Sequence, residues 1–141
     1  MNRLIAMYQL RFPKFALKIG DELKMLVGAV THVMTVVALL GGGDYLVLDA
    51  PKNGTACFKR LSELLASGQT IRLGRRGHDG WQEQQAVWQR ANEVLGSPNL
   101  LLRWNCEHIS SYVRTGKAES PQLRGFFAVV IGTAALFAIA N

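Results

Sequence analysis

The sequence predicts an α+β domain, an antiparallel sheet packed with helices, followed by a hydrophobic C-terminal helix. Two runs rich in β-branched and apolar residues, 30–40 and 45–48, flank the glycine-rich stretch Gly41-Gly42-Gly43-Asp44, a pattern typical of an antiparallel hairpin. Helical patterns recur later in the chain, and each is followed by a glycine suited to end a helix: 58–66, 81–95 and 105–114. With 141 residues, the chain is long enough to bury one core.

The N-terminal 19 residues mix basic side chains with aliphatic and aromatic ones. They fit a strand or helix that packs on the domain, or alternatively a basic segment lying on a membrane surface. Pro13 argues against one uninterrupted helix. The chain begins like a signal peptide, but Gln9, Arg11 and Lys14 interrupt the apolar run, so we expect no secretion by the usual route.

The central elements follow from turn signals and apolar spacing. Residues 19–24 contain a turn signal that leads into a strand at 25–27, and His32 lies at the start of the first hairpin arm. A further strand is expected at 70–73, followed by a basic loop. Asp79 is suited to cap the helix 81–95, whose apolar face would carry Trp88, Ala91 and Leu95.

Ser120-Pro121 is the pattern of an N-cap followed by proline at the first helical position, so a last helix should start there. Its uncharged part, 125–140, would span about 24 Å at 1.5 Å per residue, less than the ~30 Å hydrocarbon core of a bilayer. A membrane anchor would therefore need Gln122, Leu123 and a snorkelling Arg124, or local thinning of the bilayer. The alternative is a helix buried in the domain or in an oligomer. We divide the chain into a domain at 1–120 and a hydrophobic helix, a possible membrane anchor, at 121–141.

Composition limits the classes of partner. A formal charge of +6 favours an anionic partner, a membrane surface or nucleic acid. Arg72, Arg75 and Arg76 fit a solvated loop better than a nucleic-acid contact, so no nucleic acid is expected. Cys57 and Cys106 demand no disulfide framework, and a free Cys106 suits a reducing compartment. The cysteines and histidines lack paired zinc spacings, and the glycine run lacks the lysine of a phosphate loop, so we expect no metal and no cofactor.

The chemistry is concentrated at Asn105-Cys106-Glu107-His108, where an apolar run gives way to a helical pattern. Asn is a favoured N-cap, which places Cys106 at the first helical position, where the helix dipole favours a thiolate. A base must then be supplied by a histidine. His108 should face away from Cys106, about 200° around the helix, and His78 lies in a loop. His32 lies on a rigid strand, although a buried cysteine and a core histidine are the plainer interpretation.

At these residues the sequence resembles the lecithin–retinol acyltransferase (LRAT)-like family, permuted papain-like thiol enzymes that include phospholipase/acyltransferases. Asn105-Cys106-Glu107-His108 looks like the family's NC-box, and His32 occupies the place of its H-box histidine. Gly20-Asp21, Tyr45 to Pro51 and Arg114-Thr115-Gly116 are further similarities, and the resemblance covers roughly residues 19–140. It implies a permuted papain-like fold and attack by Cys106 on an acyl ester, with His32 as base and a thioester as intermediate.

One departure concerns the family's second histidine, which falls on Leu48, a residue that cannot orient an imidazole. Asp49 is the nearest polar candidate, but strand alternation sends it to the opposite face unless a bulge intervenes. Either Asp49 serves, or a backbone carbonyl serves, or activity is lost.

The resemblance implies an acyltransferase or phospholipase acting on acyl lipids, on the cytoplasmic side of a membrane or in the cytoplasm. The alternatives are a non-catalytic binding protein of the same fold and a thiol peptidase or amidase.

Overall fold

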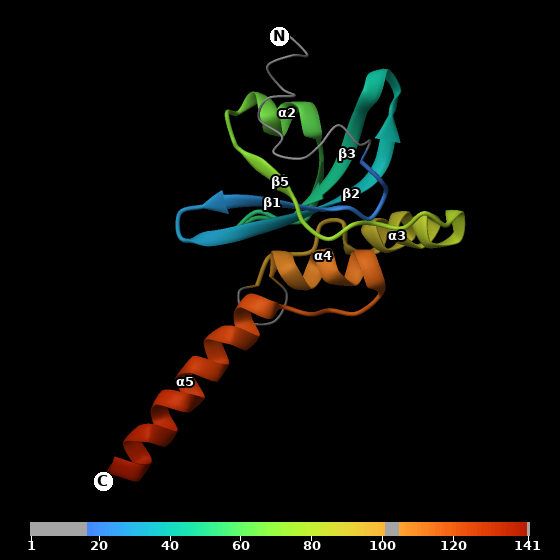
Figure 1. Ribbon diagram of the computed structural model, residues 1–141. Helices are drawn as coiled ribbons and strands as arrows, with labels where there is room; N and C mark the ends of the chain where they lie inside the picture. Colours follow the sequence, from blue (N-terminus) through green and yellow to red (C-terminus); the bar gives the residue numbers. More distant parts are fainter. Residues whose placement is uncertain (1–16, 101–104, 141) are drawn as a thin grey trace.

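A five-stranded antiparallel sheet with the strand order β4-β3-β2-β1-β5 forms the centre of the computed structural model (Figure 1), which describes residues 17–100 and 105–140. The strands are β1 (Glu22–Val27), β2 (Val30–Leu40), β3 (Asp44–Asp49), β4 (Cys57–Arg60) and β5 (Ile71–Leu73). The helices are α2 (Leu61–Ala66), α3 (Trp81–Val94), α4 (Cys106–Thr115) and α5 (Pro121–Ala140), and a short 3-10 turn, η1, covers Gly41–Gly43. The predicted α+β class with an antiparallel sheet is confirmed.

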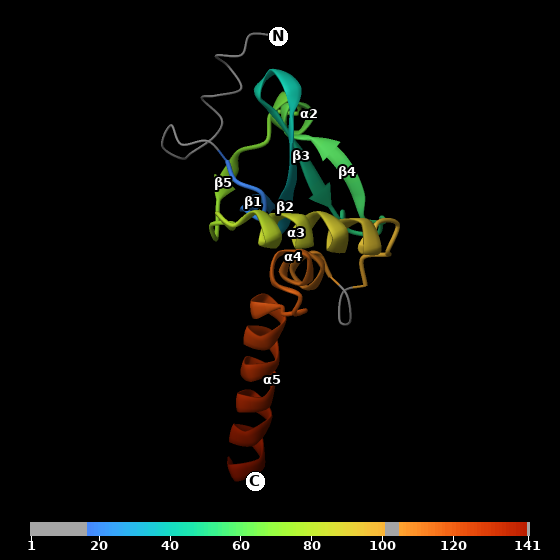
Figure 2. The same cartoon turned by 90° about the vertical axis from the view of Figure 1, so that its right-hand side faces the viewer.

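Helices cover both faces of the sheet. Helix α2 packs over one face, and α3 and α4 lie side by side on the other (Figure 2). Each face has its own apolar cluster. The cluster under α2 includes Leu23, Met34 and Val47, whereas the cluster under α3 and α4 includes Leu48 and Ile109. Burial of these clusters supplies the main driving force that holds α4 against the sheet.

The predicted hairpin is confirmed as β2 and β3, joined by η1. Gly42 and Gly43 adopt positive φ angles of 77° and 79°, a region that favours glycine, which explains why the turn needs this composition. The pairing of β2 with β3 is irregular between Val36 and Ala38, where β2 contains a bulge. This bulge changes which residues of the two strands share a face.

The region after the hairpin differs from its prediction. Residues 58–60 belong to strand β4, and only Leu61–Ala66 are helical, because β4 pairs with β3 along Phe58↔Leu48 and Lys59↔Val47. The amphipathic spacing fitted a helix, but pairing with the neighbouring strand overrode it. The strand predicted at 70–73 is confirmed as β5.

Helix α3 forms over almost the range predicted for it, but its cap was assigned wrongly and its buried face was right only at Ala91. Gly80 is the N-cap residue, and Asp79 instead forms an ion pair with Lys18. The buried face carries Val87, Ala91 and Val94, whereas Trp88 and Leu95 are exposed. Trp88 stacks on Phe58 with ring centroids 5.5 Å apart.

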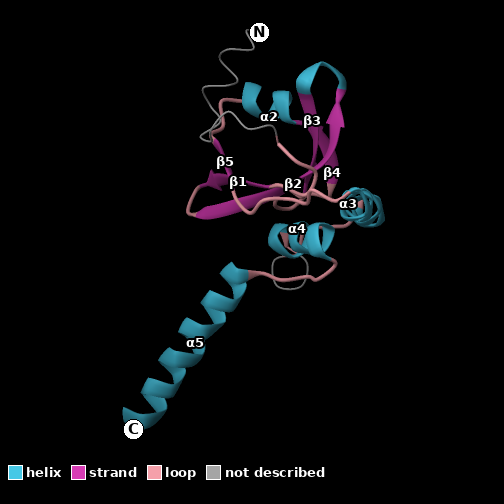
Figure 3. Ribbon diagram, turned by 45° about the vertical axis from the view of Figure 1, so that its right-hand side comes forward, coloured by secondary structure: helices cyan, strands magenta, loops and turns pink. Residues whose placement is uncertain are grey.

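Helix α5 begins as predicted. The Ser120 hydroxyl oxygen accepts the backbone N–H of Leu123 at 3.3 Å, and Pro121 is the first helical residue. From there α5 extends away from the sheet and its covering helices (Figure 3). Within the described residues, no helix combines the length and apolarity that crossing a bilayer requires. The expectations for residues 1–16 and for the apolar run at 101–102 lie outside the described residues.

Candidate active site

The start of α4 has the cap that the sequence predicted. The Asn105 side-chain oxygen accepts the backbone N–H groups of Glu107 and His108, each at 3.0 Å, and Cys106 is the first residue of the helix. His108 completes the cap, because its Nδ1 accepts the Asn105 backbone N–H at 3.3 Å. His108 is therefore a structural residue. The cap fixes the backbone on both sides of the thiol.

His32 is held between two groups. Its Nε2 lies 2.5 Å from Asp49 Oδ1, and the side chain of Cys106 lies near enough to the ring to raise its pKa. The other Asp49 oxygen, Oδ2, accepts a hydrogen bond from Lys59 Nζ at 2.5 Å. Both His32 and Asp49 are shielded from solvent, with side-chain exposures of 12% and 4%. The structure therefore brings together the three residues that the sequence singled out, with Lys59 behind them.

The strand register explains how Asp49 reaches His32. Leu48 lies directly opposite Thr35, and directly opposed residues share a face of the sheet. His32 precedes Thr35 by three positions and Asp49 follows Leu48 by one, so both lie on the other face. The expectation that alternation separates Asp49 from His32 assumed that Leu48 shares the face of His32. That assumption was wrong, and the bulge between Val36 and Ala38 lies within the pairing that sets this register.

Strand β3 ends at Asp49, whereas β2 continues to Val30 beyond the last β2–β3 pair. His32 thus lies on a part of β2 that pairs with β1 but not with β3. At this open end of β2, Cys106 at the start of α4 is near enough to the imidazole to influence its pKa. Thr35 Oγ1 and Ser110 Oγ, 2.7 Å apart, tie α4 to β2 one turn further along the helix.

The surroundings of His32 favour the imidazolium. Burial by itself disfavours the charged ring, but the hydrogen bond that the ring donates to Asp49, its interaction with Cys106 and the negative charges of both raise the pKa of His32 to about 9. For Asp49, burial opposes ionisation, yet the hydrogen bonds of His32 and Lys59 bring its pKa below the ordinary value. The geometry thus suits a charged pair in which the carboxylate holds the imidazolium.

A pH dependence of stability follows. Since the His32 pKa rises from 6.5 in the unfolded chain to about 9 in the folded one, its contribution is complete below pH 6.5 and is lost as the pH rises through 9. The full shift corresponds to roughly 3 kcal/mol at 1.36 kcal/mol per unit. We expect the free energy of unfolding, measured in urea, to fall across this window, and His32→Gln to flatten the decline. An equal decline in His32→Gln would contradict this assignment.

The remaining histidine and cysteine lie elsewhere. His78 Nε2 contacts the Arg114 carbonyl oxygen at 2.9 Å and so joins the 74–80 loop to the end of α4. Cys57 and Cys106 are both free thiols. Lys59 was missed because the sequence placed it in a helix. Assigning residues 57–60 to a strand that pairs with β3 would have placed Lys59 near Asp49.

The fold and the site together define a class of protein. It comprises α+β domains in which a thiol at a capped helix start lies beside an imidazole that is held by a carboxylate. No protein-family model matches the chain. The sequence is 28% identical over 145 aligned residues to phospholipase A and acyltransferase 2 of Homo sapiens, a match that covers all of this chain and 86% of that protein. This whole-length match supports the resemblance to the LRAT-like family that the sequence motifs indicated.

Proposed function

We propose that the protein is a cysteine-dependent phospholipase or acyltransferase that acts on the acyl esters of lipids. The observation that carries the proposal is the contact series Cys106–His32–Asp49, with the thiol at a helix start. Similarity to a protein named for phospholipase and acyltransferase activity supports the ester chemistry. A permuted papain-like arrangement, in which a helix presents the thiol to a histidine on a sheet, is consistent with the order of elements.

In the first half-reaction, the Cys106 thiolate attacks the ester carbonyl carbon, and a C–S bond forms. The developing oxyanion would lie near the backbone N–H of Cys106, which has no intrahelical acceptor at the first helical position. The C–O bond to the lipid alcohol then breaks. The His32 imidazolium gives its proton to the leaving alkoxide and becomes neutral.

In the second half-reaction, neutral His32 takes a proton from water or from an acceptor alcohol. The resulting nucleophile attacks the thioester carbonyl, and the C–S bond breaks. The products are a fatty acid or a new acyl ester, together with the regenerated thiolate–imidazolium pair. Asp49 binds Nε2 in both steps, which leaves Nδ1 for the thiol and the leaving group.

Two alternatives concern the same site. A non-catalytic binding protein was suggested by Leu48, but Asp49 supplies the partner that Leu48 cannot, which removes the main reason for that interpretation. A thiol peptidase or amidase would use the same cysteine and histidine, and parallel assays on peptide and phospholipid separate the two. We propose that the enzyme works at the cytoplasmic side of a membrane, where a free thiol persists.

The direct test is mass spectrometry of the intact protein after incubation with phospholipid. We expect an added mass equal to one acyl chain, located on Cys106 by peptide mapping, and its absence in Cys106→Ala. The adduct should disappear on treatment with hydroxylamine, which cleaves thioesters. Release of fatty acid without any adduct, at the same rate in Cys106→Ala, would refute the proposal.

A further inference from the structure

The turn between β1 and β2 exposes apolar side chains. Leu26, Val27 and Val30 are 70%, 53% and 57% exposed, and they surround Gly28 and Ala29, which are exposed as well. Isolated exposed apolar residues are common on soluble proteins, but three at one hairpin tip form a continuous apolar surface. This surface, Leu26–Val30, is here called the hairpin tip.

A basic pair lies directly behind the hairpin tip. Lys24 on β1 is the register partner of Arg72 on β5. Both line a hollow of about 460 Å³ that also includes Leu26 and Thr31. Lys24 forms an ion pair with Glu22 at 3.3 Å, but its side chain remains 44% exposed. From its end inward, the hairpin therefore presents first the apolar tip and then the two cations, Lys24 and Arg72, which lie beside the open hollow.

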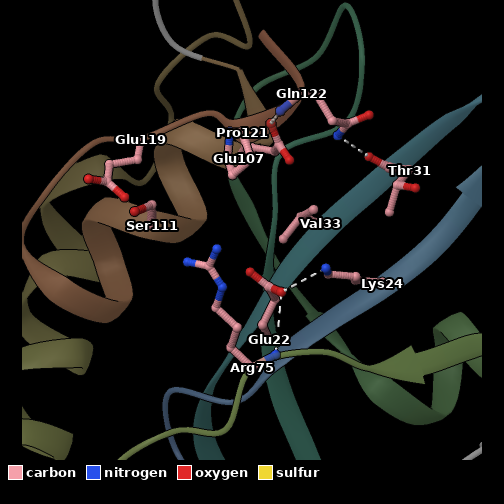
Figure 4. Close-up of a pocket in the computed structure, with 10 residues that line it drawn as sticks. All are labelled: Glu22, Lys24, Thr31, Val33, Arg75, Glu107, Ser111, Glu119, Pro121 and Gln122. Atoms are coloured by element: carbon pink, nitrogen blue, oxygen red, sulfur yellow. Dashed lines mark hydrogen bonds and ion pairs between the residues drawn. The ribbon is translucent and has the colours of Figure 1, made fainter. Parts of the chain in front are cut away.

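Helix α5 starts beside the same hairpin. The Gln122 side-chain N–H donates to the Thr31 carbonyl oxygen at 3.0 Å, a bond drawn in Figure 4. Phe126, Phe127, Val129 and Ile131 are exposed further along α5. In Figures 1 and 3, the hairpin and α5 both project from the same side of the domain. Two apolar projections thus leave the domain close together.

We propose that the hairpin tip inserts into the surface of an anionic phospholipid bilayer, with Lys24 and Arg72 at the level of the lipid phosphates. Along a strand, Lys24 lies roughly 7–10 Å behind the residues of the tip. Interfacial apolar groups penetrate about 5–10 Å into the boundary between headgroups and acyl chains, so the cations meet the phosphates when the tip is inserted. The charge of +6 and the neighbouring α5 favour a lipid surface over a protein partner.

The proposal rests on the proposed lipid substrate and deepens it. His32 follows Val30 by two residues on β2 and lies opposite Met25. Insertion of the tip therefore brings the edge of the sheet that carries His32 to the bilayer interface. An acyl ester group of a membrane lipid lies near that interface, so docking would deliver the substrate without its full extraction into water.

The first experiment places a fluorescent label on the hairpin tip of a variant that cannot hydrolyse lipid. In the full chain with Cys57→Ser and Cys106→Ala, Val27→Cys carries an environment-sensitive fluorophore, and the control carries it at Leu39→Cys. Leu39 is 61% exposed near the other end of β2. With vesicles of phosphatidylcholine and phosphatidylserine, we expect a blue shift and quenching by nitroxide lipids at position 27 only. The shift should weaken as salt is raised.

A second measurement uses charge substitution. Leu26→Glu should lower the vesicle partition constant, measured by sedimentation, about tenfold, since burial of one leucine contributes enough for that factor. Leu39→Glu should lower it less than about twofold. Hydrolysis of a short, water-soluble ester should be unchanged in Leu26→Glu. Equal losses in both variants, an unshifted label on bound protein, or a shift caused by self-association without lipid would overturn the proposal. Site-specific binding with no ester hydrolysis would leave it standing and refute the proposed enzyme activity.

Discussion

Cys106→Ala is expected to lower the rate of fatty-acid release from phospholipid by at least about 10⁴-fold, the scale on which loss of a covalent nucleophile acts. The expectation follows from the position of the thiol, at the start of a helix whose cap fixes the backbone and in contact with His32. His32 cannot take over the function of Cys106, because without the sulfur there is no thiolate to attack the ester. The measurement is release of labelled fatty acid from vesicles at saturating substrate.

Cys57→Ser is the matched control, because Cys57 is the other free thiol and is also half-buried. We expect it to change the rate less than about threefold. Circular dichroism and urea unfolding must show that Cys106→Ala is folded. Since Cys106 is only partly buried beside the apolar cluster under α3 and α4, its replacement should leave that cluster intact. Wild-type rates in a folded Cys106→Ala protein would exclude a thiol mechanism.

Local rules were sufficient for the elements that carry their own signals. The glycine-rich turn between β2 and β3 needs positive φ angles, and its composition reported that directly. The cap of α4 depends on one asparagine and the residues that follow it, so it too could be predicted. The start of α5 was readable from Ser120-Pro121 for the same reason. In each case the interaction that decides the structure lies within a few residues.

The errors arose where pairing between distant segments decides. The apolar spacing of 58–66 fits a helix, but the edge of β3 offers unpaired backbone groups, and β4 forms there instead. That error hid Lys59, whose contact with Asp49 depends on strand pairing. Asp49 was named as a candidate, but whether it shares the face of His32 could not be decided from the sequence, because the bulge in β2 leaves no mark comparable to a turn glycine. Membrane insertion of 121–141 stays a prediction.

Asp49→Asn is expected to lower kcat/KM for ester hydrolysis by about 10²–10⁴-fold, because the amide holds the imidazole without its charge and can favour the wrong tautomer. The hydrogen bond and charge of Asp49 are among the interactions that raise the pKa of His32 to about 9. Their loss lowers that pKa. Since the imidazolium protonates the leaving alkoxide, the decline of activity on the alkaline side should move to lower pH. The measurement is kcat/KM for a soluble ester across the alkaline range.

Leu48→Met is the control that separates the role of Asp49 from damage to the strand. Leu48 is next to Asp49 but faces the cluster under α3 and α4, so a methionine of similar volume should cost less than about 1.5 kcal/mol. Its alkaline decline should stay where it is in the wild type. A purely structural role for Asp49 would lower activity in Asp49→Asn without moving the pH profile. A shifted profile in Asp49→Asn alone would identify its carboxylate as the group that holds His32 charged, in the place that the family's second histidine would occupy.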